Sequence, residues 1–165
     1  MSQIRIAGIV KESIVDGPGL RYTVFVQGCP HRCPECHNPH THPREGGNLY
    51  HHEELLADIA RNPLLQGVTI SGGEPLAQAR ELIPFAEGVR GMGKNLWIYT
   101  GYIWESLLHI SEDVRLLIET ADILVDGSYI QSASAPGLIF RGSSNQRIID
   151  AQTSLREGQV VLANY

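Results

Sequence analysis

The residues best suited to chemistry in this sequence are its three cysteines, Cys29, Cys33 and Cys36. They are spaced C-x3-C-x2-C, and the chain has no other cysteine. An odd number of thiols cannot all pair as disulfides within one chain. Prolines inside the run and a glycine before it disfavour helix and strand, so we predict a loop that directs three sulfurs to one point. Thiolates grouped in this way bind zinc or an iron–sulfur cluster.

The missing fourth cysteine separates two kinds of site. Structural zinc sites and [4Fe–4S] clusters both usually take four protein ligands, most often cysteines. A zinc site could be closed by His31 or His37, and the protein would then be a non-enzymatic zinc-binding interaction module. A cluster held by three cysteines would instead leave one iron open to an exogenous ligand, and that iron could contact a substrate directly.

The elements that must position this loop follow an alternating pattern. Apolar, β-branched segments predict buried strands, at residues 22–26, 67–70, 95–99 and 123–125. Apolar residues at helical spacing predict helices between them, at residues 53–61, 82–89 and 111–121. We expect Ser111 to cap the last helix and Pro84 to lie in the first turn of its helix, where a missing N–H costs little.

The remaining segments give weaker signals. Residues 4–10 predict a short edge strand, and residues 37–50, rich in histidine, proline and glycine, predict a loop. Residues 137–140 and 147–149 predict short strands, whereas residues 158–165 fit either a terminal strand or a tail.

Strands that alternate with helices form parallel sheets with right-handed crossovers. Ligands bind such sheets at the C-terminal ends of the strands. We therefore expect the cysteine loop, Glu74, Thr100 and Asp126 to converge on one face. A closed (β/α)8 barrel needs about 250 residues, and this chain has 165. The predicted fold is α/β, a partial, open β/α barrel whose open side would admit a macromolecule.

Composition narrows the class of protein further. A length of 165 residues, with 42% hydrophobic and 19% charged residues, predicts one globular domain over residues 1–165. A net charge of −5 argues against a nucleic-acid partner. The sequence has no apolar run of the roughly 20 residues that span a bilayer, and no secretory signal. These features predict the reducing cytoplasm, where thiols stay available for metal.

Beyond the cysteine spacing, five further motifs resemble those of radical S-adenosylmethionine (radical SAM) enzymes, and more closely the activases of glycyl-radical enzymes. Asp16-Gly17-Pro18-Gly19 is similar to their D-G-P-G segment, and Ser71-Gly72-Gly73-Glu74-Pro75 to their G-G-E motif. Thr100-Gly101-Tyr102, Val125-Asp126-Gly127 and the Arg141-Gly142-Ser143-Ser144-Asn145-Gln146-Arg147 segment resemble the branch that activates anaerobic ribonucleoside-triphosphate reductases. The resemblance runs over residues 16–147, with the motifs in the same order.

The resemblance implies a specific reaction. Cys29, Cys33 and Cys36 would ligate a [4Fe–4S] cluster, whose open iron is chelated by the amino and carboxylate groups of S-adenosyl-L-methionine. Reductive cleavage of that cofactor gives a 5′-deoxyadenosyl radical, which generates a glycyl radical on the reductase. A low-potential donor such as reduced flavodoxin would supply the electron, and no side chain is needed as a general acid or base. An activase of another glycyl-radical enzyme, such as pyruvate formate-lyase, is the alternative.

The resemblance also implies roles for individual residues. Ser71, Gly72, Gly73 and Glu74 would receive the methionine amino group of the cofactor. A carboxylate makes a charge-assisted hydrogen bond to an ammonium group.

Four other positions complete the predicted site. Thr100 and Tyr102 would lie beside the polar groups of the cofactor, and the segment around Asp126 would help to shape the entrance for the glycine. Arg141 could pair with the cofactor carboxylate through its planar guanidinium. Many radical SAM enzymes carry an aromatic residue before the third cysteine, but here that residue is Glu35. We therefore expect the adenine to contact His37 or Tyr102.

Overall fold

The fold is built on one sheet with the strand order β3-β1-β2-β4-β5-β6-β7. The computed structural model describes residues 3–31, 36 and 39–165. Its strands are β1 (Gln3–Ser13), β2 (Arg21–Val26), β3 (Asn48–His51), β4 (Gly67–Gly72), β5 (Asn95–Tyr99), β6 (Ile123–Asp126) and β7 (Arg147–Asp150). Its α-helices are α1 (His52–Ala60), α2 (Ala79–Gly91), α3 (Trp104–Leu107), α4 (Glu112–Thr120) and α5 (Ala151–Glu157).

The four central strands, β2, β4, β5 and β6, run parallel. Antiparallel strands flank them, β1 and β3 on one side and β7 on the other. The sheet has two separate edges, β3 and β7, so it stays open. The prediction of a partial, open β/α barrel with parallel strands is therefore confirmed.

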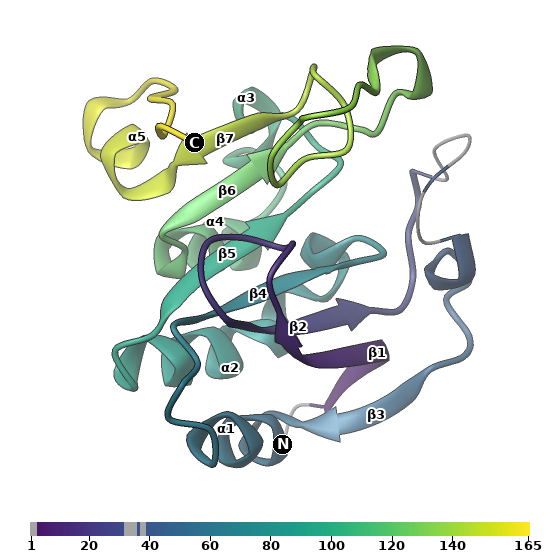
Figure 1. Ribbon diagram of the computed structural model, residues 1–165, viewed down its shortest axis with the longest axis vertical. Coiled ribbons are helices and arrows are strands. Elements are labelled where there is room, and N and C mark those ends of the chain that lie inside the picture. The colour runs from purple at the N-terminus through teal and green to yellow at the C-terminus, as the bar shows by residue number, and fades with distance from the viewer. Residues whose placement is uncertain (1–2, 32–35, 37–38) are drawn as a thin grey trace.

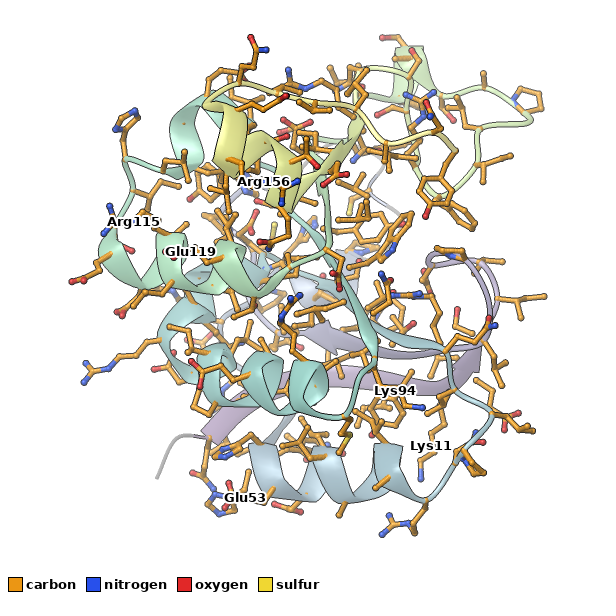
Figure 2. All side chains as sticks on the ribbon, turned by 90° about the vertical axis from the view of Figure 1, so that its left-hand side faces the viewer. Lys11, Glu53, Lys94, Arg115, Glu119 and Arg156 are labelled. Atoms are coloured by element: carbon orange, nitrogen blue, oxygen red, sulfur yellow. The ribbon has the colours of Figure 1, made fainter. Side chains whose placement is uncertain are left out.

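The helices pack side by side on one face of the sheet, in the order α1, α2, α4 and α5 (Figures 1 and 2). Alternate residues of the central strands point to this side and are fully buried with the apolar helix faces. Among these core residues are Val68, Ile70, Leu96, Ile98, Leu124, Leu82, Phe85, Val89 and Leu117. Charged side chains such as Glu53, Arg115 and Glu119 project from the outer faces of these helices (Figure 2).

The opposite face of the sheet is covered by loops and the C-terminal residues. A second apolar cluster lies there, formed by Trp97, Ile123, Val125 and Ile148 with Tyr99, Phe140 and Ala163 packed against it. The loop after β1 crosses the same face (Figure 1). In a closed barrel further strands would cover such a face, and here loops take their place.

Arg21 fastens the loop after β1 to the sheet. The side chain is buried, and its guanidinium donates to Thr69 Oγ1 at 2.8 Å, to the Val68 carbonyl at 2.9 Å and to the Pro18 carbonyl at 3.0 Å. It also lies 5.5 Å from the centre of the Trp97 ring, within range of a cation–π contact. Burial lowers the pKa of Arg21 to about 10, so the guanidinium remains charged at neutral pH. This interior charge is stabilised by oxygen atoms and an aromatic face.

Several local predictions were wrong. Residues 48–50 belong to strand β3, which pairs antiparallel with β1 and makes β3, not β1, the edge of the sheet. A strand of four residues is too short to show periodicity. Residues 137–140 form no strand, because Gly137 and Phe140 adopt φ values of 87° and 63°, which extended strands do not allow. Pro84 lies inside α2, beyond its first turn.

Other local features agree with the sequence or extend it. Ser111 caps α4 as predicted, accepting a hydrogen bond from Val114 N at 3.1 Å. Residues 147–149 form a strand, as predicted. Helix α5 was not predicted, although Asp150 at its N-cap and Gly158 in the left-handed conformation at its C-cap are its local signals. No helix of the described residues is long and apolar enough to cross a membrane.

We predict that Arg21→Met lowers the free energy of unfolding by about 2–4 kcal/mol, because it removes several buried hydrogen bonds and leaves Thr69 with fewer partners. Urea denaturation of the protein without cofactor measures this change. Arg80→Met, at an exposed position of α2, is the control and should change stability by less than about 0.5 kcal/mol. Equal stability of the two variants would contradict the role given to Arg21.

Candidate functional site

A cavity of about 370 Å³ lies at the C-terminal ends of the parallel strands, on the face without helices. Strand ends and the segments that follow them supply its walls. Among the residues that line it are Phe25, Cys29, His31, Cys36, Ser71, Gly72, Gly73, Tyr99, Thr100, Gly101, Gly127, Tyr129, Phe140, Arg141 and Gln146. Ligand sites of open parallel sheets occur at this edge, so the predicted convergence is confirmed for the cysteine loop and Thr100.

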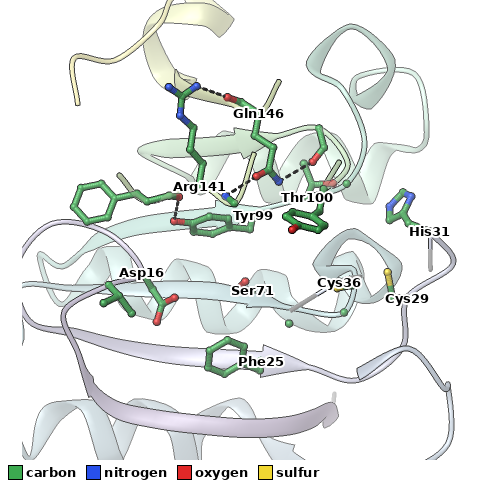
Figure 3. A pocket seen from close by; sticks show the side chains of 18 of the residues that line it. Asp16, Phe25, Cys29, His31, Cys36, Ser71, Tyr99, Thr100, Arg141 and Gln146 are labelled. Carbon is green, nitrogen blue, oxygen red and sulfur yellow. Dashed lines mark hydrogen bonds between the residues drawn. The ribbon is translucent and has the colours of Figure 1, made fainter. Parts of the chain in front are cut away.

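The cavity has two chemically different ends. Cys29, Cys36 and His31 lie at one end, and Asp16 lies at the other, with Ser71 and Tyr99 between them (Figure 3). Thiolate sulfur is the usual protein ligand of iron–sulfur clusters. The first end therefore fits a cluster, with two of the three predicted ligands in the described part of the chain. The predictions for Cys33, Glu35 and His37 concern positions outside the described residues.

The two glycines after β4 bring backbone close to the start of the cysteine loop. A Cβ atom on Gly73 would lie 2.3 Å from the carbonyl oxygen of Gly28, and Gly72 has a φ of 100°. Glu74 N also donates to that Gly28 oxygen at 2.8 Å. Only glycine fits such an approach, so this segment and the cysteine loop form one packed unit along the cavity wall.

The Glu74 side chain does not line the cavity but is buried behind it. Its Oε1 accepts a hydrogen bond from Gly101 N at 2.8 Å and lies 2.6 Å from His31 Nε2. Its Oε2 accepts from Leu76 N at 3.0 Å, and Thr100 Oγ1 donates to both oxygens, at 3.0 and 2.9 Å. The carboxylate thus joins the segments that follow β2, β4 and β5.

Thr100 and Tyr102 take different positions. Thr100 lines the cavity, and its hydroxyl donates a hydrogen bond to Glu74. Tyr102 is outside the lining and packs edge-on against the His31 ring, with ring centres 4.5 Å apart. Burial, together with the negative charges of Glu74 and Cys29, raises the pKa of the Tyr102 phenol above its ordinary value. The structure therefore places Tyr102 beside the cysteine loop.

Arg141 lines the cavity, but its guanidinium donates to backbone carbonyls of its own turn, Gln146 at 2.8 Å and Ser144 at 3.3 Å. In Figure 3 the guanidinium points away from the cysteines. The neighbouring Phe140 has a φ of 63° and accepts a hydrogen bond from the Tyr99 hydroxyl at 2.5 Å. This bond holds the turn against the sheet, and the turn forms one wall of the cavity.

Asp126 is buried and takes part in a network of hydrogen bonds and ion pairs behind the cavity. Its carboxylate accepts from Trp104 N at 2.8 Å and pairs with Arg147 at 2.6 Å. Arg147 also bonds Glu105 at 2.7 Å, and these two carboxylates raise the pKa of the guanidinium. The following residue, Gly127, reaches the cavity. Asp126 therefore shapes this wall indirectly, by fixing the ends of β6 and β7.

Several lining residues were missed by the sequence reasoning, among them Phe25, Tyr99, Tyr129 and Phe140, whereas Gln146 belongs to the motif of residues 141–147. A signal for the first two exists in the sequence. Phe25 lies opposite Ser71 in the β2–β4 register, and Tyr99 is the last residue of β5. Alternation along parallel strands puts such residues on one face. Tyr129 and Phe140 lie in irregular segments and offer no comparable periodicity.

Comparisons with known proteins show which proteins this chain is similar to. Residues 15–149 match the family described as a 4Fe-4S single cluster domain. Anaerobic ribonucleoside-triphosphate reductase-activating proteins are similar over most of the chain. Those of Salmonella typhi, Vibrio cholerae and Enterobacteria phage T4 are 37%, 35% and 33% identical, and the alignments cover 81%, 82% and 81% of this chain and 90%, 90% and 86% of those proteins. QueE from Escherichia coli superposes with a TM-score of 0.49 at 24% identity, covering 60% of this chain and 52% of QueE.

We predict that Glu74→Gln lowers the free energy of unfolding by about 1–3 kcal/mol even without any cofactor. The glutamine –NH2 group would face N–H and O–H donors, whose hydrogen bonds the carboxylate oxygens accept. Chemical denaturation of the cofactor-free protein measures the change. Glu87→Gln, on the exposed side of α2, is the matched control. A cofactor-free Glu74→Gln protein as stable as the control variant would show that the buried network contributes little.

Proposed function

The chain belongs to the family of anaerobic ribonucleoside-triphosphate reductase-activating proteins, and we propose that it generates a glycyl radical on such a reductase. The observation that carries this proposal is the single cavity that joins two cysteines of the C-x3-C-x2-C loop to the glycine segment after β4 and to the end of β5. Under this proposal residues 1–165 act as one radical SAM domain.

The cysteine end of the cavity would hold a [4Fe–4S] cluster through Cys29, Cys33 and Cys36. When bound and reduced, the cluster and S-adenosyl-L-methionine together supply a 5′-deoxyadenosyl radical that removes a hydrogen atom from a glycine Cα. The chain itself contributes binding, orientation and the exclusion of water. The electron would come from a low-potential donor such as reduced flavodoxin.

Ser71, Gly72 and Gly73 are the candidates for receiving the methionine amino group, because they line the cavity next to the cysteines. Glu74 would act from behind, keeping this segment and Thr100 in place through its buried hydrogen bonds. Arg141 would need to release the carbonyls of its turn before it could pair with a cofactor carboxylate. For the adenine, the aromatic rings of Tyr99 and Phe140 offer contacts within the lining, whereas Tyr102 packs outside it.

The loops over the face of the sheet that carries no helices suggest how the protein substrate reaches the cavity. The apolar side chains of Val15 and Leu138 reach the cavity from two loops that cover the sheet face. Val15 is 69% exposed. A folded reductase that inserts a glycine-bearing segment between these loops would close the remaining side and exclude water from the radical.

A zinc-binding module is the alternative from another class. It leaves the cavity and the glycine segment without a role, although a cysteine loop alone would suit zinc. Metal analysis and the visible spectrum of protein purified without oxygen separate the two: iron, sulfide and a brown colour support the activase, whereas colourless protein with stoichiometric zinc supports the module.

We predict that Cys29→Ala, Cys33→Ala and Cys36→Ala each abolish assembly of a cleavage-competent [4Fe–4S] cluster, because the chain has no spare cysteine. Iron and sulfide are quantified after anaerobic reconstitution, together with reductive cleavage of S-adenosyl-L-methionine. A variant that keeps a full cluster and normal cleavage would remove that cysteine from the ligand set.

We predict that the reduced protein with S-adenosyl-L-methionine gives a glycyl radical on intact anaerobic ribonucleoside-triphosphate reductase, seen by electron paramagnetic resonance. The amounts of 5′-deoxyadenosine and radical should be near equal. Pyruvate formate-lyase serves as the competing substrate, and a radical on it alone would redirect the proposal to that enzyme.

Docking should complete the site, so a short peptide carrying the reductase glycine should react far more slowly than the intact reductase at equal concentration. The measured quantity is the rate of 5′-deoxyadenosine formation that depends on each substrate. Equal rates would refute the role of docking while leaving the reaction itself in place.

A further inference from the structure

We infer that His31 is a positioning residue, which holds the cysteine loop against the ends of β4 and β5 through its hydrogen bond to Glu74, an inference that rests on the proposed function. His31 stands midway between Cys29 and Cys33 in the sequence. Its side chain links this loop to the buried carboxylate of Glu74.

The bond between His31 and Glu74 is short and sheltered. The distance from His31 Nε2 to Glu74 Oε1 is 2.6 Å, and the two side chains are 16% and 0% exposed. The backbone N–H groups of Leu76 and Gly101 already donate to the same carboxylate. A carboxylate can only accept hydrogen bonds, so the imidazole is the donor and its Nε2 atom carries the hydrogen.

The ring of His31 is confined on two further sides. A Cβ atom on Gly101 would lie 2.5 Å from the His31 Cδ2 atom, so only a glycine leaves room for the ring. Tyr102 packs edge-on against the ring, at 4.5 Å between centres and 74° between planes. Because Glu74, Gly101 and Tyr102 surround the imidazole, the ring has one available position. The ring in turn fixes the backbone of the loop at His31.

Backbone hydrogen bonds anchor the beginning of the loop. Gly28 N donates to Thr41 O at 2.6 Å and Cys29 N to His42 O at 3.0 Å. Both bonds tie the loop to the segment before β3. Glu74 N donates to Gly28 O at 2.8 Å and ties the start of the loop to the segment after β4. The His31–Glu74 bond adds a side-chain link beyond Cys29, to the same carboxylate that binds the segment after β5. It would therefore help to set the distance between the cysteine sulfurs and the glycine segment.

This assignment separates His31 from the zinc-ligand role that its sequence position also allows. Its Nε2 atom is engaged with Glu74 in the interior rather than directed to the sulfurs. Partners that orient the ligands of a metal site typically change metal affinity by about 10–100-fold when they are removed. The expected consequence of losing the bond is a less tightly held cluster.

The test compares two amide substitutions that differ only in reach. The amide nitrogen of glutamine in His31→Gln can occupy the place of Nε2 and donate to Glu74, whereas that of asparagine in His31→Asn is too short. His109→Asn, at an exposed position after α3, is the control. The readouts are the rate of iron loss to a chelator, the electron paramagnetic resonance spectrum of the reduced cluster with and without S-adenosyl-L-methionine, and the thermal unfolding of cofactor-free protein.

We expect His31→Asn to lose iron about tenfold faster than the unmodified protein and to show a changed spectrum. His31→Gln and His109→Asn should resemble the unmodified protein. Unchanged iron loss and spectrum in His31→Asn would overturn the inference, even if its unfolding temperature fell, because the role would then be structural only. Equal defects in the two His31 variants would overturn it too, since the donor would not be the cause.

A second variant keeps the inference testable if His31→Asn fails to fold. Gly101→Ala keeps the imidazole but pushes it from Glu74, so it should also accelerate iron loss. Normal iron loss and a normal spectrum in Gly101→Ala would overturn the inference. Failure of the proposed function would look different, because the unmodified protein would then assemble no cluster at all.

Discussion

The structure depends on one buried carboxylate. Glu74 follows β4, yet it bonds the segment after β5 through Thr100 and Gly101, and the cysteine loop after β2 through His31. A buried charge is tolerated only where several donors compensate for its lost hydration. Here those donors belong to the three segments that must meet at the cavity. The cost of burying the charge is thereby offset by contacts that also define the site.

This arrangement changes the meaning of the glutamate in the Ser-Gly-Gly-Glu segment. By analogy with a carboxylate that pairs with an ammonium group, the side chain was expected to face the cofactor. Its oxygens instead face the protein interior, and the preceding glycines line the cavity. The glycines allow the close approach of two backbones, and the glutamate keeps them there. One short motif thus contains both a contact surface and its support.

The two faces of the sheet divide stability and function. On one face, helices bury a continuous apolar core. On the other, loops hold a smaller apolar cluster and leave the cavity at the strand ends. The loops are fastened by a few directional bonds, such as Arg21 to the Pro18 carbonyl and the Tyr99 hydroxyl to the Phe140 carbonyl. Such a cover can admit a large partner more readily than strands of a closed barrel could.

Local signals in the sequence determined the parts of this protein that depend on neighbouring residues. The alternation of β-branched strands and amphipathic helices predicted the parallel central sheet, and Ser111 predicted the start of α4. The C-x3-C-x2-C spacing indicated the chemistry, and the order of strand ends predicted that Thr100 would meet the cysteine loop. These inferences succeed because periodicity and capping act over a few residues, and because parallel strands end at a common edge.

Only the tertiary structure decided the direction of individual side chains and the conformation of segments whose sequence signals are weak. Strand β3 exists because β1 offers it an edge, and the turn around Phe140 is held in an unusual conformation by Tyr99, which lies 41 residues away in the sequence. Likewise, nothing near Glu74 in the sequence shows that its carboxylate turns inward. Leu76 N, two residues away, donates to one of its oxygens, but the other donors lie 26, 27 and 43 residues away and come together only when the sheet has formed.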